Sequence, residues 1–253
     1  MNATMLQLEI RRIVRDPVTL FFTVGLPVFF YLIFGADQPY SEESAGNGNV
    51  AMSIMVAMAA YGAVSATVGI GGRAALEKRQ GWGRQLGLTP LRDSAYVAVK
   101  SVLAVVFASV TVALVFLAGG LTTAAATPLA WMLSFGLLVV GAAVFALYGL
   151  CFGLAFGSEA ALSAAGGSVV ILGFLGNIFI PLSGTLLAVA KWTPLYGYAA
   201  LARFPISEGT ILVGGSGETV VEPLWIPLAN VAGWLVVLAL LAGWLVRRGR
   251  VRP

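Results

Sequence analysis

The chain has no histidine, one cysteine and few charged residues. Without histidine in its 253 positions, imidazole acid/base catalysis and imidazole metal ligands are excluded. The lone Cys151 excludes an intrachain disulfide and a cysteine metal cluster, and its apolar sequence neighbours favour a packing role. Charged residues make up only 10% of the chain, whereas soluble domains carry roughly 25%. This composition argues against a soluble domain.

Apolar residues are abundant and occur in long runs. They make up 59% of the chain, and the mean hydropathy is +0.92. Runs of about 20 apolar residues predict transmembrane helices. The sequence therefore predicts an all-α integral membrane protein, with residues 1–253 forming a single transmembrane domain of six spans. The predicted spans are 18–36, 50–72, 101–120, 129–156, 160–190 and 225–246. Pro181 removes a backbone hydrogen bond, which predicts a break near the outer end of the fifth span.

The basic residues predict how the spans are oriented. Thirteen of the fifteen lie before the first span, between spans two and three, or after the sixth, and Lys191 and Arg203 are the exceptions. The positive-inside rule places that majority side in the cytoplasm, so we expect both termini there and the chain in the cytoplasmic (inner) membrane. Residues 5–14 alternate apolar and polar positions, which favours a short helix on the inner membrane surface. We interpret the first span as a retained anchor.

Groups that would support chemistry in the membrane are missing from the middle of the predicted spans. Lys100, Glu159 and Lys191 lie at span ends, where long side chains reach headgroups or water. The phosphate-binding motif GxxxxGK[ST] is also absent. We therefore expect neither an enzyme nor a chain that binds a cofactor or a metal. Any energy for active transport would come from another subunit, and nucleic acid is not an expected partner.

Residues 76–91, LEKRQGWGRQLGLTPL, form the most informative segment outside the predicted spans. The segment is too basic to insert into a membrane and too short to fold alone. Its apolar positions would suit a short helix that docks on another protein, and Pro90 would end that helix. A solvated basic loop is the alternative.

This segment resembles the intracellular loop of the type-2 permeases of ATP-binding-cassette (ABC) transporters, also called type V exporters. The matching residues are Glu77, Lys78, Arg79, Gly81 or Gly83, Leu86, Thr89, Pro90 and Leu91. The first span is similar to that of the family at Arg15, Pro17, Pro27 and Gly35, and residues 179–205 are similar at Pro181, Pro194 and Arg203. The three motifs occur in the family's order and cover nearly the whole chain.

The resemblance implies a permease that pairs with itself or with a sister permease and docks on two cytoplasmic ATPase subunits. Those subunits would bind ATP and magnesium. It also implies an N-terminal elbow helix and a coupling helix around residues 76–91. The implied coupling residues are Glu77, Lys78, Arg79, Trp82, Leu86, Thr89, Pro90 and Leu91. A re-entrant outer segment between spans five and six would contain Pro181, Trp192, Pro194 and Arg203.

The implied activity is export of a hydrophobic or amphipathic molecule, as in bacterial drug and antibiotic exporters. Export of a lipid or glycan precursor is an alternative within the family. An ion-coupled transporter or channel and a membrane-embedded enzyme are alternatives outside it, which the lack of central ionisable residues weakens.

Small and polar residues within the spans predict packing and a pathway. Gly149, Gly153 and Gly157 recur at spacing four, which favours close approach of another helix. Asn177 is expected to form an interhelical hydrogen bond or to line a pathway. The candidates for the pathway or the dimer interface are Tyr61, Ser65, Thr67, Phe174 and Asn177. The outer aromatic residues Trp192, Tyr196, Tyr198 and Trp225 are expected at the headgroup level.

Overall fold

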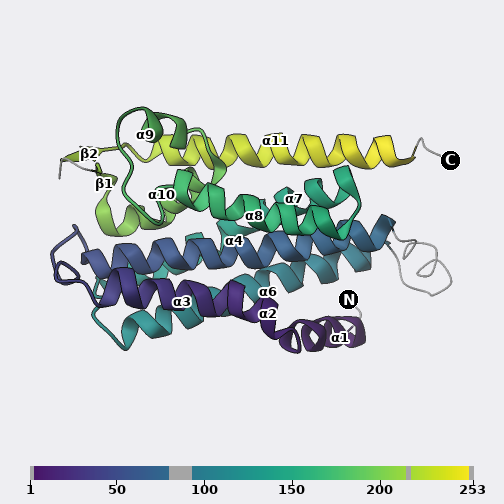
Figure 1. The fold of residues 1–253 in the computed structure, drawn as a ribbon, viewed down its shortest axis with the longest axis horizontal. Coiled ribbons are helices and arrows are strands. Elements are labelled where there is room, and N and C mark those ends of the chain that lie inside the picture. The colour runs from purple at the N-terminus through teal and green to yellow at the C-terminus, as the bar shows by residue number, and fades with distance from the viewer. Residues whose placement is uncertain (1–2, 80–92, 215–217, 251–253) are drawn as a thin grey trace.

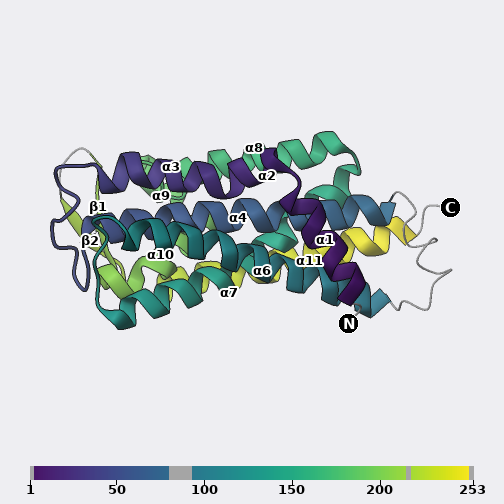
Figure 2. The same ribbon diagram turned by 90° about the horizontal axis from the view of Figure 1, so that it is seen from below.

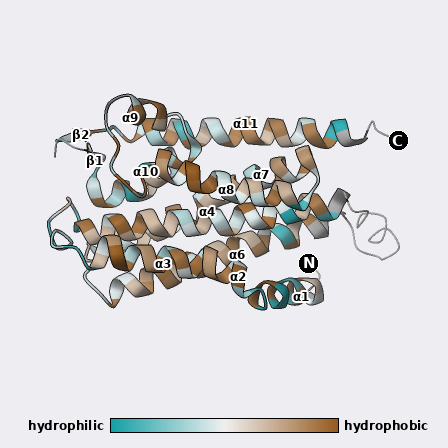
Figure 3. Cartoon of the chain, in the orientation of Figure 1, coloured by the Kyte–Doolittle hydropathy of each residue, from teal (hydrophilic) through white to brown (hydrophobic). Residues whose placement is uncertain are grey.

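The long helices of the computed structural model run side by side along one axis (Figure 1). The structure describes all residues except 1–2, 80–92, 215–217 and 251–253. Both described ends of the chain lie at the same end of the bundle, which we call the inner end (Figure 1). The opposite, outer end carries a short antiparallel pair of strands. Figure 3 shows hydrophilic residues concentrated towards the ends of the bundle, notably in the first helix at the inner end.

Five helical segments are long and apolar enough to cross a membrane by length and composition: Pro17–Ala36, Val50–Glu77, Val97–Gly120, Pro128–Phe156 and Trp225–Arg248. The last four lie in α4 (Val50–Arg79), α6 (Asp93–Gly120), α7 (Pro128–Phe156) and α11 (Trp225–Arg250). A further apolar helix, α8 (Glu159–Leu175), is shorter. These helices confirm the prediction of a helical, multi-pass membrane protein.

The N-terminal region begins with α1 (Ala3–Val14), which lies oblique to the long helices (Figure 2). The first apolar segment then combines α2 (Pro17–Leu20), η1 (Phe21–Gly25), α3 (Leu26–Tyr31) and η2 (Leu32–Ala36). The two η elements are wider, π-type turns. Pro27 has no backbone N–H, so the regular helical hydrogen-bond pattern cannot continue unchanged through it.

Helix α4 lies in the middle of the bundle (Figure 2), and 83% of its apolar window is buried. Small residues explain how closely it approaches α7. A Cβ atom added at Gly149 would collide with the backbone of Val68, and one at Gly153 would lie 2.7 Å from the carbonyl oxygen of Gly72. The predicted packing role of Gly149 and Gly153 is therefore confirmed. Gly157 has a different role, because its φ of 64° ends α7 in the left-handed conformation that glycine favours.

The predicted fifth span, 160–190, is divided into two helices, as Pro181 predicted. Helix α8 ends at Leu175, and a second short helix, α9 (Gly184–Ala190), follows an irregular turn. Pro181 lies within this turn, and α8 ends before it at Leu175. Asn177 has a φ of 55°, a left-handed conformation that cannot continue a right-handed helix.

The outer end holds α10 (Pro194–Ser207) and the strands β1 (Thr210–Leu212) and β2 (Thr219–Val221). The strands pair antiparallel with Thr210 opposite Val221, a hairpin that the all-α prediction did not include. Tyr196 and Tyr198 of α10 are buried in the bundle, so their rings pack against protein. Trp192 is 81% exposed and Trp225 is also exposed, as expected for aromatic residues at a membrane interface.

Candidate functional site

Four charged side chains from three helices meet at the inner end, and we call them the inner charge cluster: Glu9 and Arg12 of α1, Glu77 of α4 and Lys100 of α6. The ammonium of Lys100 lies 2.8 Å from a carboxylate oxygen of Glu9 and 2.8 Å from one of Glu77. The guanidinium of Arg12 donates to the other oxygen of Glu77 at 3.2 Å. The cluster thus joins α1, α4 and α6.

Lys100 and Glu77 are buried, so each charge needs an oppositely charged partner for the fold to be stable. The side chain of Lys100 is 8% exposed and that of Glu77 is 11% exposed. A buried charge is strongly unfavourable unless opposite charges surround it, and Lys100 has two carboxylates. Glu77 also lies in the last turn of α4, where the helix dipole disfavours a carboxylate. Its two cationic partners offset both costs.

A second ion pair attaches the start of the first apolar segment to α4. Arg73 donates to Asp16 at 3.0 Å and to the hydroxyl of Thr19 at 3.0 Å. Asp16 caps α2 by accepting hydrogen bonds from the hydroxyl of Thr19 at 2.6 Å and from its backbone N–H at 3.0 Å. The hydroxyl bond first, and then the backbone bond, lower the pKa of Asp16 to about 2, and Arg73 acts in the same direction. Because Arg73 precedes Glu77 by one helical turn, both ion pairs hold the same face of α4.

Apolar side chains also attach α1 to the bundle. Ile13 is buried, and Leu6 and Ile10 pack beside it against α4 and α6. The residues they cover include Ile70 and Phe107. Helix α1 is therefore fixed to the bundle by both apolar packing and ion pairs.

The cluster lies next to the predicted coupling segment, residues 76–91. Helix α4 runs to Arg79 and α6 begins at Asp93, so Glu77 and Lys100 belong to the two helices that flank residues 80–92. The first residues of the predicted segment are thus the end of α4. Trp82, Leu86, Thr89, Pro90 and Leu91 lie outside the described residues, as do the side chains of Lys78 and Arg79.

The structure changes the interpretation of Glu77 and Lys100. Sequence matching assigned Glu77 to contact with a partner, but its carboxylate forms ion pairs within the chain. Lys100 was interpreted as a side chain that reaches headgroups or water, and it is instead buried between carboxylates. The sequence did not single out Glu9 or Arg12. Glu9 and Arg12 carry opposite charges three residues apart on an amphipathic helix, and this spacing could have indicated that both lie on one side of it.

The five pathway candidates are only partly brought together. Tyr61 and Phe174 meet through Phe179, whose ring centroid is 5.0 Å from each of theirs. Phe30 of α3 packs edge-on against Phe179 at 5.6 Å. Ser65 lies one turn beyond Tyr61 and donates to the Tyr61 carbonyl. We call Phe30, Tyr61, Phe174 and Phe179 the aromatic cluster; sequence reasoning missed Phe30 and Phe179.

The side chains of Thr67 and Asn177 form hydrogen bonds to the backbone nearby in the chain. Thr67 is fully buried, and its hydroxyl donates to the carbonyls of Ala63 and Val64 in its own helix. The side-chain oxygen of Asn177 accepts the backbone N–H of Leu182 at 2.8 Å, which stabilises the turn after α8. The side-chain oxygen of Asn177 thus bonds within this turn, and a place for Asn177 on a pathway or at a dimer interface stays a prediction.

Polar contacts also fix the predicted outer segment. Glu222 is buried, and its carboxylate lies 2.5 Å from the ammonium of Lys191 and accepts the hydroxyl of Tyr196 at 3.0 Å. The half-buried guanidinium of Arg203 donates to the backbone oxygen of Asn177 at 3.2 Å. These bonds hold α9, α10 and β2 together.

Helix α11 adds a clamp on the turn between α9 and α10. The side-chain amide of Asn230 donates to the carbonyls of Lys191 at 2.8 Å and Thr193 at 3.2 Å. The indole of Trp234, one turn along, donates to the carbonyl of Trp192 at 2.9 Å. Three consecutive carbonyls are thus bound by one face of α11. Pro194 begins α10 directly after this turn, and Pro181 lies before α9.

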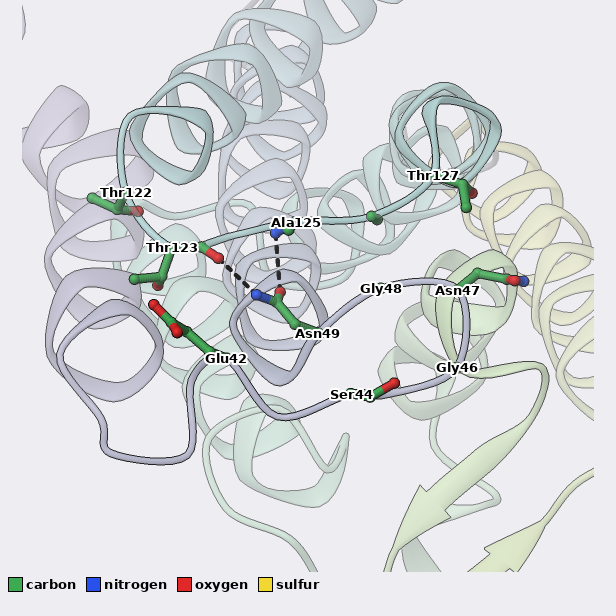
Figure 4. A pocket seen from close by; sticks show the side chains of 11 residues that line it. Glu42, Ser44, Gly46, Asn47, Gly48, Asn49, Thr122, Thr123, Ala125 and Thr127 are labelled. Carbon is green, nitrogen blue, oxygen red and sulfur yellow. Dashed lines mark hydrogen bonds between the residues drawn. The ribbon is translucent and has the colours of Figure 1, made fainter.

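An open depression of about 790 Å³ lies at the outer end, between the loops before α4 and α7 (Figure 4). The amide of Asn49 donates to the carbonyl of Thr123 at 2.7 Å and accepts the N–H of Ala125 at 3.0 Å. The hydroxyl of Thr127 caps α7. These polar groups join two loops. Within the described ranges, no group of three or more His, Cys, Asp or Glu residues is placed to hold a metal ion.

The chain is similar along nearly its whole length to a bacterial membrane transport protein. It is 24% identical over 246 residues to "Putative transport permease YvfS" of Bacillus subtilis (strain 168), covering 95% of this chain and 94% of that relative. No protein-family model matches the chain.

Proposed function

We propose that this chain is the transmembrane permease subunit of an ABC exporter. It pairs with a second permease, identical or related, and with two cytoplasmic ATPase subunits that bind ATP and magnesium. The long apolar helices, the similarity to a transport permease and the three ordered motifs support this proposal. The chain itself supplies the path and the mechanical coupling.

The position of the inner charge cluster is the observation that carries the proposal. Residues 80–92 connect α4 to α6, and Lys100 bridges Glu77 of α4 to Glu9 of α1. A force applied to that connection would move the inner ends of three joined helices together. Because α4 is the most buried helix of the bundle, this movement would reach the core directly.

Within this proposal, the coupling residues divide into two roles. Arg79, Trp82, Leu86 and the Thr89 to Leu91 stretch contact the ATPase. Glu77 acts from inside the permease, where its two ion pairs keep the end of α4 attached to α1 and α6. ATP-driven closure of the ATPase pair supplies the free-energy difference between the two permease states.

The proposed topology has six passes with both termini in the cytoplasm of the cell. Helix α8 supplies the sixth pass with its 17 residues, and α9 and α10 form a re-entrant cap over the exit. The location of both described chain ends at the inner end supports an even number of passes. The inner end then faces the cytoplasm, where the basic residues concentrate.

The proposed substrate is a hydrophobic or amphipathic small molecule resembling a drug or antibiotic. The aromatic cluster supports this class, since its rings offer apolar contact area and Phe174 is exposed at the bundle surface. Charged residues are absent from the middle of the five described apolar segments, which disfavours a strongly charged cargo. A lipid or glycan precursor is the alternative cargo.

Affinity purification of the tagged permease from its native host tests the proposal. We expect an ATPase subunit to co-purify in equal amount, and the double variant Arg79→Ala and Leu86→Ala to lose it. The matched control is Arg247→Ala with Arg248→Ala, which also removes basic charge at the inner end and is expected to retain the ATPase. Purification of the permease alone in several mild detergents, at normal membrane abundance, would contradict the proposal.

A further inference from the structure

We propose that the outward face of α1 is a binding site for the headgroups of anionic phospholipids. We call this face the basic face of α1; it is formed by Leu8 and Arg11 and is extended by Arg15, which follows α1 and whose backbone N–H bonds to the Arg11 carbonyl at 3.2 Å. The inference rests on one part of the proposed function, the placement of the inner end at the cytoplasmic leaflet. It is independent of ATP coupling and of the substrate.

Among the described residues, the two arginines of this face have no side-chain partner. Glu9 and Arg12 are used in the inner charge cluster. Arg11 and Arg15 are exposed, and among the described residues neither forms an ion pair or a side-chain hydrogen bond. The full positive charge of both guanidinium groups is therefore available to a ligand.

Apolar side chains accompany these charges. Leu8 is 62% exposed and lies on the same side as Arg11 and Arg15, at spacings of three and seven residues. Val14, 58% exposed, lies beside them. Guanidinium groups that flank exposed aliphatic side chains match the boundary between headgroups and acyl chains, where arginine reaches phosphate while the apolar groups enter the hydrocarbon.

The position of α1 favours lipid over a protein as the occupant. Arg15 and Asp16 alone separate α1 from the first apolar segment, which is the least buried of the described apolar segments except that of α11. Phe21 and Phe22 follow within a few residues and are exposed to the bundle's surroundings. The arginines thus lie where a lipid-facing segment leaves the membrane. Anionic headgroups supply the phosphate oxygens that guanidinium groups bind with paired hydrogen bonds.

Attachment of α1 to the bundle makes this face a rigid site. The ion pairs of Glu9 and Arg12 and the buried side chain of Ile13 fix the helix before any lipid arrives. Binding then requires no folding of the helix, which lowers its entropic cost.

Native mass spectrometry of the purified full chain tests the proposal, with phosphatidylglycerol and phosphatidylcholine titrated separately. We expect tighter binding of phosphatidylglycerol, and a loss of about tenfold in that affinity for Arg11→Gln with Arg15→Gln. The charge-preserving pair Arg11→Lys and Arg15→Lys should keep most of it. Binding of phosphatidylcholine should be the same in all variants.

The control is Arg247→Gln with Arg248→Gln, which removes two other basic residues at the inner end. Equal loss in this control would overturn the proposal, because binding would then follow general surface charge. Unchanged phosphatidylglycerol affinity in the variant Arg11→Gln with Arg15→Gln would also overturn it. The proposal would likewise be overturned if this variant kept its bound lipid but lost a protein that co-purifies with the wild-type chain. Melting temperatures of all variants check folding. If the chain prefers phosphatidylglycerol as expected but no ATPase co-purifies with it, the lipid site stands and only the proposed exporter function is refuted.

Discussion

The ammonium of Lys100 lies 2.8 Å from the carboxylate of Glu77, and this pair joins the two helices on either side of residues 80–92. Glu9 provides a second carboxylate at the same distance from Lys100. Because the ammonium is almost completely buried, its removal leaves two carboxylates facing each other without their shared cation. We therefore expect the pair to contribute to the stability of the fold and to keep the inner ends of α4 and α6 together.

Lys100→Met is expected to destabilise the chain by about 3 to 5 kcal/mol, the usual cost of leaving a buried charge without its partner. The double variant Lys100→Met with Glu77→Gln should be less destabilised than the two single effects combined, since it also removes one of the two carboxylate charges that the ammonium contacts. Thermal unfolding in detergent measures both. Additive effects would contradict the direct coupling of Lys100 and Glu77.

Gly149→Ala is expected to destabilise the bundle by about 1 to 3 kcal/mol, because the new methyl group collides with the backbone of Val68 and forces α7 from α4. Gly136→Ala on the same helix is the matched control, since a Cβ atom there meets open space. That control should be neutral or slightly stabilising through helix propensity. Similar melting temperatures for the two variants would refute the close packing of α4 and α7.

Asn230→Ala is expected to loosen the turn between α9 and α10 by about 1 to 3 kcal/mol, because the carbonyls of Lys191 and Thr193 lose their donor. Hydrogen exchange of the backbone amides in residues 184–196 should become faster, while exchange in α4 stays the same. Trp234→Phe removes only the bond to Trp192 and should have a smaller effect. Faster exchange throughout the bundle would point to global unfolding instead of release of a clamp.

Asp16→Ala is expected to destabilise the chain at pH 7 by about 1 kcal/mol through loss of the cap on α2. The pKa of Asp16 is about 2 in the folded chain and about 3.9 in an unfolded one, so its contribution is complete above pH 4. It is lost as the pH falls from about 4 to about 2. The stability difference between wild type and variant, followed by unfolding in detergent, should shrink in that window. A constant difference would show that the carboxylate charge has no part in the cap.

Much of the fold could be predicted because membrane helices follow local rules. Long apolar runs mark α4, α6, α7 and α11 closely, since each run must bury its backbone polar groups in a helix in lipid. The glycine spacing in α7 predicted close packing correctly. Pro181 correctly predicted a break in the fifth span, although the left-handed conformation of Asn177 ends α8 before the proline is reached.

The candidate site was located only approximately from the sequence. The resemblance drew attention to residues 76–91, but not to the partners that lie around their ends. Tyr196 and Tyr198 illustrate the same difficulty, because aromatic residues near a membrane surface suit headgroups and a packed core equally well. Burial in α10 decided between the two.

By itself, the sequence determined the membrane environment, the approximate helices and the absence of histidine or phosphate-loop chemistry, because composition and apolar length act locally along the chain. Only the tertiary structure decided that Glu77 and Lys100 form a buried pair with Glu9 and Arg12. Residues far apart in the chain meet through the packing of α1 on α4 and α6. The strength of an ion pair depends on that distance and burial, which no local pattern of residues specifies.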